Sequence, residues 1–122
     1  METTISILYV DDEPLNLKLF SINFKKKYNV LTALSGEEGL LLLSKNDQIK
    51  VVVSDMKMPK MDGIEFISQA KKDYPNIVFF ILTGYDITPE ISQALKNNLI
   101  NRYFSKPLNI EEIDKSIHLA LK

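Results

Sequence analysis

The sequence predicts an α/β fold, in which a parallel β-sheet is covered by α-helices on both faces. Short apolar runs alternate five times with longer segments of helical periodicity. Most of these runs are continuously apolar, as expected of strands that are buried on both faces. A parallel sheet with helices on either side accounts for both patterns.

The run from Lys50 to Ser54 is taken as the central strand. Its three consecutive valines suit a strand buried on both faces. The run ends at Asp55, and Pro59 prevents the strand from continuing. Asp55 is therefore predicted at the carboxyl end of a central strand, the edge at which open α/β sheets bind ligands. Taken alone, Asp55 would be better explained as a residue that caps a turn.

The N-terminal part of the chain contains two further strands and the helix that joins them. The first strand is expected at 5–10, and Pro14 falls in the first turn of the following helix, where its missing N–H is tolerated. Lysines 25–27 form the solvated end of this helix, and residues 28–33 make a more polar strand near an edge of the sheet. The expected buried face of the helix is Leu17, Phe20 and Phe24.

Capping residues indicate where the other four helices begin. A Ser, Asp or Asn followed by Glu three positions later satisfies the free N–H groups of a first helical turn, and Thr before Pro is a second such signal. The expected N-caps are Ser35, Asp62, Thr88 and Asn109. Apolar residues repeat behind them at 40–43, at Ile64, Ile67 and Ala70, at Ile91, Ala94 and Leu95, and at Ile110, Ile113, Ile117 and Leu121. The remaining strands are expected at 77–82 and 101–104.

Five βα units in succession restrict the topology. Crossovers between parallel strands are right-handed, which fixes most of the arrangement. We predict a flavodoxin-like sandwich: a three-layer, doubly wound (βα)5 fold with strand order 2-1-3-4-5. Because the chain has 122 residues and no linker or low-complexity segment, residues 1–122 are expected to form a single domain, with no output domain in this chain.

Composition argues against several classes of function. The formal net charge of −1 gives no basic surface for nucleic acid and no reason to expect membrane binding. The absence of cysteine rules out disulfides and thiolate metal sites. The first residues do not resemble a secretion signal, and the longest apolar runs are too short to span a membrane. We therefore expect a cytoplasmic protein.

Polar residues follow four of the five expected strands, and the fold would gather them at one edge. Three carboxylates so close together repel one another and require a cation, for which a hard divalent ion is the natural candidate. A lysine and a hydroxyl beside them could hold the oxygens of a phosphoryl group on Asp55. Each residue alone has an ordinary structural explanation, but their order at successive strand ends favours function. The residues are Asp11 and Asp12, Asp55, Thr83 and Lys106.

Four segments make the chain similar to a known family over nearly its whole length. They are LYVDDEP at 8–14, SDMKMPKMDG at 54–63, LTGY at 82–85 and YFSKP at 103–107. Together they resemble the receiver domains of response regulators in two-component phosphorelay signalling. That family has a flavodoxin-like fold, so the strand order predicted above rests partly on this resemblance.

The resemblance implies the chemistry of the site. Asp55 would accept a phosphoryl group from the phosphohistidine of a histidine kinase or from a phosphotransfer protein. Magnesium, or manganese in its place, would be bound directly by Asp12, Asp55 and the backbone carbonyl of Lys57, and through water by Asp11. The physical chemistry agrees, since phosphoryl transfer depends mainly on positioning and charge neutralisation.

The resemblance also assigns roles on the opposite side of the site. Thr83 and Lys106 would hold the phosphoryl oxygens, and the Lys106–Pro107 peptide would be cis, which only an X-Pro bond adopts cheaply. Tyr103 matches the aromatic switch of the family and would turn inward as Thr83 moves, although an aromatic ring packed at a strand edge is a serious competing explanation. The surface formed by 88–98, 101–104 and 109–121 would then change for an unidentified protein partner, and a phosphorylation-dependent homodimer stays open.

Three positions bear on how the site would behave. Gly84 stands where the family usually has alanine after the switch threonine. Lys57 and Tyr85 occupy the two positions that tune the lifetime of the phosphoryl group. Because a long cation and a bulky ring hinder an attacking water, we expect slow autodephosphorylation.

Other functions fit less well. In phosphatases that use an aspartate nucleophile on a similar sheet, the nucleophile usually follows the first strand, and a second Asp stands two residues later. Here Asp55 follows the third strand, and Lys57 stands two residues after it. A histidine phosphotransfer domain would be helical, and flavin binding would need a phosphate-binding loop after the first strand. A pseudo-receiver that only binds is disfavoured by the intact site. We expect a receiver that assists its own phosphorylation and dephosphorylation and is not a dedicated enzyme.

Overall fold

The computed structural model describes residues 4–84 and 87–122, and within them five strands alternate with five helices. No helix in these ranges is long and apolar enough to cross a membrane. The strands are β1 (Ser6–Val10), β2 (Asn29–Ala33), β3 (Ile49–Ser54), β4 (Val78–Thr83) and β5 (Arg102–Ser105). The helices are α1 (Pro14–Phe24), α2 (Gly36–Lys45), α3 (Gly63–Asp73), α4 (Pro89–Lys96) and α5 (Ile110–Ala120).

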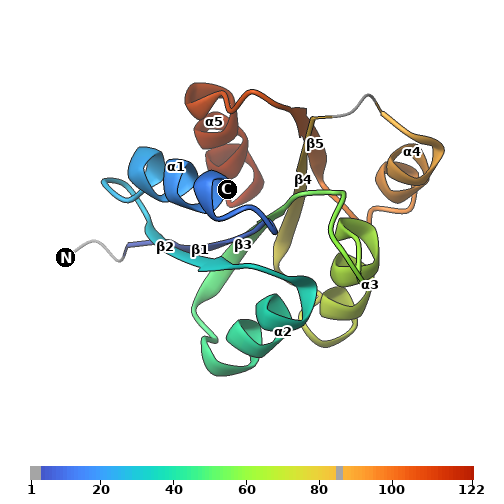
Figure 1. Ribbon diagram of the computed structural model, residues 1–122. Helices are drawn as coiled ribbons and strands as arrows, with labels where there is room; N and C mark the ends of the chain where they lie inside the picture. The colour runs from blue at the N-terminus through green and yellow to red at the C-terminus, as the bar shows by residue number, and fades with distance from the viewer. Residues whose placement is uncertain (1–3, 85–86) are drawn as a thin grey trace.

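The strands form one parallel sheet in the order β2-β1-β3-β4-β5. Helices α1 and α5 cover one face of the sheet, and α2, α3 and α4 cover the other (Figure 1). The predicted three-layer, doubly wound architecture and its strand order are therefore confirmed. This topology places the carboxyl ends of all five strands at the same edge.

Two apolar layers hold the helices to the sheet. On the side of α1 and α5, the rings of Tyr9, Phe20 and Phe24 stack in series, with centroids 4.3 and 4.4 Å apart. On the other side, Phe66 of α3 is fully buried, and it fits there because α2 has no side chain at Gly39. A β-carbon at Gly39 would lie 3.0 Å from the Phe66 ring. These layers fix the strands whose ends carry the polar residues.

The predicted caps are present at the helices that carry them. Asp62 and Glu65 form a reciprocal capping box at the start of α3. The side chains of Ser35, Thr88 and Asn109 each accept a hydrogen bond from the N–H three residues later. In α3 the half-buried Ile64 packs against the core as predicted, and Phe66 is fully buried beside it. The inward face of α5 differs from the prediction, because Ile110, its first residue, is 39% exposed.

Candidate functional site

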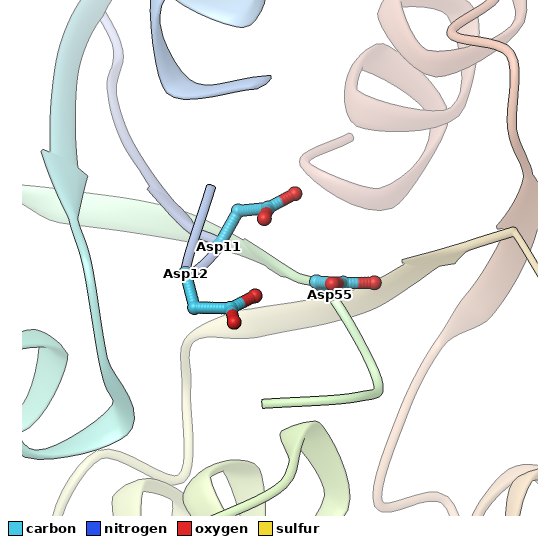
Figure 2. Close-up of side chains that lie close together, drawn as sticks. All are labelled: Asp11, Asp12 and Asp55. Atoms are coloured by element: carbon cyan, nitrogen blue, oxygen red, sulfur yellow. The ribbon is translucent and has the colours of Figure 1, made fainter. Parts of the chain in front are cut away.

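The three predicted carboxylates lie together at the carboxyl edge of the sheet. Asp11 and Asp12 directly follow β1, and Asp55 directly follows the neighbouring strand β3. The backbone N–H of Asp55 donates to the carbonyl of Val10 over 2.8 Å, which joins the two strand ends. Figure 2 shows the three side chains gathered at this point. The fold thus brings together residues that are more than forty positions apart.

These carboxylates form a donor set suited to a metal ion. Each of Asp11, Asp12 and Asp55 offers one oxygen, and the three oxygens lie within 4.8 Å of one another. Asp11 and Asp55 are buried, and Asp12 is more accessible to solvent. Hard divalent cations such as Mg²⁺ prefer oxygen ligands and usually keep several waters. The residues present therefore fit such an ion.

Lys106 is the cation that faces this acidic site. Its Nζ lies 3.3 Å from Oδ2 of Asp11 and 3.4 Å from Oδ1 of Asp55. The backbone N–H of Lys106 donates to the carbonyl of Thr83 over 2.8 Å, which holds the end of β5 against β4. The peptide bond between Lys106 and Pro107 is cis. One ammonium group therefore bridges carboxylates from two different strands.

The pKa values of Asp55 and Lys106 depend on the balance between burial and the neighbouring charges. Burial, reinforced by the Asp11 carboxylate, raises the pKa of Asp55 to about 6, although Lys106 and the N–H of Met56 lower it. For Lys106, burial alone would lower the pKa, but Asp55 and Asp11 raise it above its usual value. Lys106 is consequently charged at neutral pH, and Asp55 is an ionised carboxylate with little solvation.

Asp11 has the most complete set of hydrogen bonds at the site. Its Oδ2 accepts from the hydroxyl of Tyr9 at 2.6 Å, and its Oδ1 accepts from the N–H of Glu13 at 3.0 Å. Asn16 also donates to Oδ2, at 3.2 Å. Burial and the hydrogen bond to Asp11 raise the pKa of Tyr9, so the hydroxyl keeps its proton and acts as a donor. No local pattern singled out Tyr9, although residues two apart in an extended segment point to the same face.

The segment after Asp55 is packed closely against the start of α3. Gly63 donates its N–H to the carbonyl of Met56 over 2.8 Å. A β-carbon at Gly63 would lie 2.3 Å from the backbone oxygen of Asp55, so no larger residue fits without moving that backbone. Gly63 therefore permits the tight return of the chain that places Asp55 at the site.

The remaining predicted residues differ in burial and in their place in the fold. Thr83 is fully buried at the end of β4, and Tyr103 is half-buried on β5 against the core layer of α3 and α4. Lys57 is exposed in the segment that follows Asp55. Gly84 is exposed, and the one described residue within 4 Å of a β-carbon built there is Lys106, at 3.9 Å. Tyr85 lies outside the described residues.

The family model named Response regulator receiver domain matches residues 7–118 of the chain. The chain belongs to this family. As a receiver domain it has an acidic pocket formed by Asp11, Asp12 and Asp55 with Lys106 beside it, which is consistent with phosphorylation of an aspartate. Receiver domains are phosphorylated by histidine kinases or phosphotransferases, and they are typically not enzymes, although some longer relatives carry enzyme domains.

The receiver domain is similar both to part of a longer regulator and to a protein of about its own length. It is 32% identical over 117 residues to the transcriptional regulatory protein GlrR of Escherichia coli (strain K12), covering 95% of this chain and 26% of that protein. It is also 32% identical over 119 residues to sporulation initiation phosphotransferase F of Bacillus subtilis (strain 168), covering 95% of this chain and 94% of that protein. The chain thus spans about a quarter of the first relative and nearly all of the second.

A solved structure has the same fold. A response regulator receiver domain protein from Clostridium thermocellum superimposes with a TM-score of 0.84 at 32% identity, covering 94% of this chain and 92% of that one. The flavodoxin-like fold predicted from the sequence is therefore shared with a receiver domain of known structure.

Proposed function

We propose that this receiver domain is a phosphorylation-controlled signalling switch and that Asp55 is the phosphoacceptor. One observation carries the proposal: Asp55 follows the central strand between an acidic pair and the ammonium group of Lys106. An aspartate placed between a metal-binding donor set and a fixed cation has what an acceptor of a phosphoryl group requires. We take residues 1–122 as one receiver domain.

The reaction forms one bond and breaks one. A carboxylate oxygen of Asp55 attacks the phosphorus of a phosphohistidine, the P–O bond forms, and the P–N bond breaks. The electron pair of the broken bond stays on the imidazole nitrogen of the donor. Lys106 balances the charge on the phosphoryl oxygens, and the hydroxyl of Thr83 donates a hydrogen bond to one of them. The protein therefore contributes position and charge.

The acidic residues hold a divalent cation in this proposal. Asp12, Asp55 and the backbone carbonyl of Lys57 bind Mg²⁺, or Mn²⁺ in its place, and Asp11 acts through water. The ion supplies positive charge that offsets the repulsion between the carboxylates and the incoming phosphoryl group. The oxygen-only donor set within 4.8 Å supports this assignment.

The output of the switch is a changed surface on the side of α4, β5 and α5. Thr83 ends β4, and Tyr103 lies on the adjacent strand β5. A movement of Thr83 toward the phosphoryl group therefore changes the space available to the Tyr103 ring. Tyr103 then turns inward, and the surface of α4, β5 and α5 binds a downstream protein or a second copy of the chain. The phosphoryl donor is a histidine kinase or a phosphotransfer protein.

Intact mass measurement tests the proposal. The protein is incubated with Mg²⁺ and acetyl phosphate beside an Asp55→Asn variant and an Asp73→Asn variant, which changes an exposed carboxylate at the end of α3. We expect one labile phosphoryl group in the wild type and in Asp73→Asn, none in Asp55→Asn, and none without Mg²⁺.

Other outcomes of this experiment discriminate between functions. An adduct that survives in Asp55→Asn would assign the acceptor to another residue. If no adduct forms, a metal titration follows, because loss of Mg²⁺ binding as well would favour a module that only binds partners. Retained Mg²⁺ binding would call for a purified histidine kinase as the donor.

A further inference from the structure

We propose that Tyr9 is a positioning residue of the phosphorylation site and that its hydroxyl fixes the carboxylate of Asp11 for binding the divalent cation. The inference rests on the proposed function and extends it to a residue of the buried core. Tyr9 lies in β1, two positions before Asp11, and the hydroxyl donates to Oδ2 of Asp11 over 2.6 Å.

Among the side chains that donate to Asp11, Tyr9 is the one with the least freedom to move. It is 1% exposed, and its ring stacks on Phe20 with centroids 4.3 Å apart and an angle of 15° between the planes. The hydroxyl cannot leave Asp11 unless this part of the core repacks. Lys106, by contrast, carries its charge on a flexible side chain that is 26% exposed.

The burial of the Asp11 carboxylate gives a fixed donor its importance. Asp11 is fully buried, and a buried carboxylate is stable only when its oxygens are paired. Lys106 is shared between Asp11 and Asp55, at 3.3 and 3.4 Å. When Lys106 turns to a phosphoryl group on Asp55, Asp11 loses part of that pairing. The hydroxyl of Tyr9 stays in place and keeps the carboxylate oriented.

The tyrosine supplies both an aromatic ring and a hydrogen-bond donor at this position. The aromatic ring fills the core layer beneath α1, and the oxygen at its far end reaches the carboxylate. Phenylalanine keeps the ring and its stacking but removes the donor. Outer hydrogen-bond partners of carboxylates that bind a metal directly fix ligand orientation, and their loss typically weakens metal binding by about 10–100-fold. The effect should be smaller for Asp11, which acts through water in the proposed function.

The same core contains a matched control. Tyr28 is also buried in the layer beneath α1 and α5, and its hydroxyl donates to Asp114 of α5. Tyr28→Phe therefore removes the same kind of hydrogen bond, from a buried tyrosine to an aspartate, outside the acidic site. A merely structural effect would be seen in both variants, whereas an effect on the site would be seen only in Tyr9→Phe.

The experiment measures Mg²⁺ affinity by calorimetry for the wild type, Tyr9→Phe and Tyr28→Phe. We expect Tyr9→Phe to weaken Mg²⁺ binding by about 3- to 10-fold, less than for the partner of a direct ligand, and Tyr28→Phe to bind as the wild type does. Equal Mg²⁺ affinity in wild type and Tyr9→Phe would overturn the inference, as would equal weakening in both variants.

A second measurement needs neither metal nor phosphate. The carboxyl ¹³C resonance of Asp11 is recorded in metal-free protein, where it should shift in Tyr9→Phe and stay unchanged in Tyr28→Phe. An unchanged resonance in Tyr9→Phe would contradict the proposed contact. If the wild type acquires a phosphoryl group but Tyr9→Phe binds Mg²⁺ as tightly as the wild type, this inference is rejected and the proposed function stands. Wild type with neither Mg²⁺ binding nor an adduct would reject the proposed function, and the inference with it.

Discussion

The ammonium group of Lys106 lies 3.4 Å from Oδ1 of Asp55, yet burial of Asp55 outweighs this attraction and raises the pKa of its carboxyl group to about 6. An acid whose pKa is higher in the folded chain than in the unfolded chain binds its proton more tightly when folded. Its contribution to the free energy of unfolding therefore falls as pH rises from about 4 to about 6, and stays low above that range.

Asp55→Asn should stabilise the metal-free protein at neutral pH. One pKa unit corresponds to about 1.4 kcal/mol, so ionised Asp55 costs the fold at most about 3 kcal/mol, which an uncharged amide avoids. We expect the free energy of unfolding at pH 7.5 in EDTA to rise by about 1–3 kcal/mol. The gain should shrink below pH 6 and vanish near pH 4.

Urea unfolding at several pH values measures this effect. Asp73→Asn, which changes an exposed carboxylate, is the control and should show no comparable gain. Added Mg²⁺ should reduce the difference between wild type and Asp55→Asn, because the ion offsets the charge of Asp55. Equal stability of the two proteins at pH 7.5 in EDTA would show that Lys106 compensates fully for burial.

A second prediction concerns the close approach of Gly63 to Asp55. In Gly63→Ala the new β-carbon would lie 2.3 Å from the backbone oxygen of Asp55 and 2.9 Å from Ile81, so the backbone must move. We expect a loss of about 1–3 kcal/mol in the free energy of unfolding, together with weaker Mg²⁺ binding.

Gly84→Ala is the matched control for this substitution. Among the residues that the structure describes, its β-carbon would approach Lys106 most closely, at 3.9 Å, which is ordinary contact. The variant should be as stable as the wild type or gain up to about 1 kcal/mol, because alanine restricts the unfolded chain. Thermal unfolding and Mg²⁺ titration of the two variants would check both expectations. If Gly63→Ala has the same free energy of unfolding as the wild type, the backbone after Asp55 can shift at less cost than its packing indicates.

The sequence predicted the strand ends and helix starts because both depend on local patterns. Asp55 could be placed at the edge of the sheet since three valines precede it and Pro59 follows soon after. The capping box of Asp62 and Glu65 was predicted for the same reason. Once the strand order is known, residues at the ends of different strands must meet, and the acidic site follows from that order.

Contacts between distant segments were beyond the sequence analysis. Ile64 packs against the core as predicted, but the full burial of Phe66 was not predicted, because it depends on the space that Gly39 of α2 leaves for its ring. In the sequence Tyr9 is one more apolar residue of a strand, and no local pattern shows that its hydroxyl reaches Asp11. The hydrogen bond from Tyr28 to Asp114 joins residues 86 positions apart and has no local signal at all.

A third prediction concerns the lifetime of the phosphoryl group. Lys57 is exposed beside the site, and Tyr85 occupies the corresponding position after Thr83 in the sequence. We propose that a long cation at 57 and a bulky ring at 85 hinder an in-line water, so replacing both with alanine should speed the loss of the phosphoryl group severalfold. The decay of the adduct mass after removal of the phosphodonor measures the rate. A rate equal to that of the wild type would refute the idea, and Lys57→Ala alone would divide the effect between the two positions.

The last prediction concerns the contact between Tyr28, just before β2, and Asp114 of α5. Lys27 also binds Asp114, over 2.9 Å, and His118 lies 3.3 Å from it. Burial alone would raise the pKa of Asp114, but the hydrogen bonds from Tyr28 and Lys27 and the attraction of Lys27 and His118 hold it below its usual value. The ionised form is therefore favoured by folding, and the stability it provides is present above about pH 4 and lost as pH falls further.

Two variants test this contact through the pH dependence of urea unfolding. Tyr28→Phe should lower the free energy of unfolding by about 1.5–3 kcal/mol at pH 7, the range expected for a hydrogen bond to a charged group. Asp114→Asn should also be less stable than the wild type at pH 7, and the difference should disappear as the wild-type carboxyl group becomes protonated in acid. A deficit of Asp114→Asn that is independent of pH would assign the loss to packing, because only the ionised carboxylate gains from Lys27 and His118.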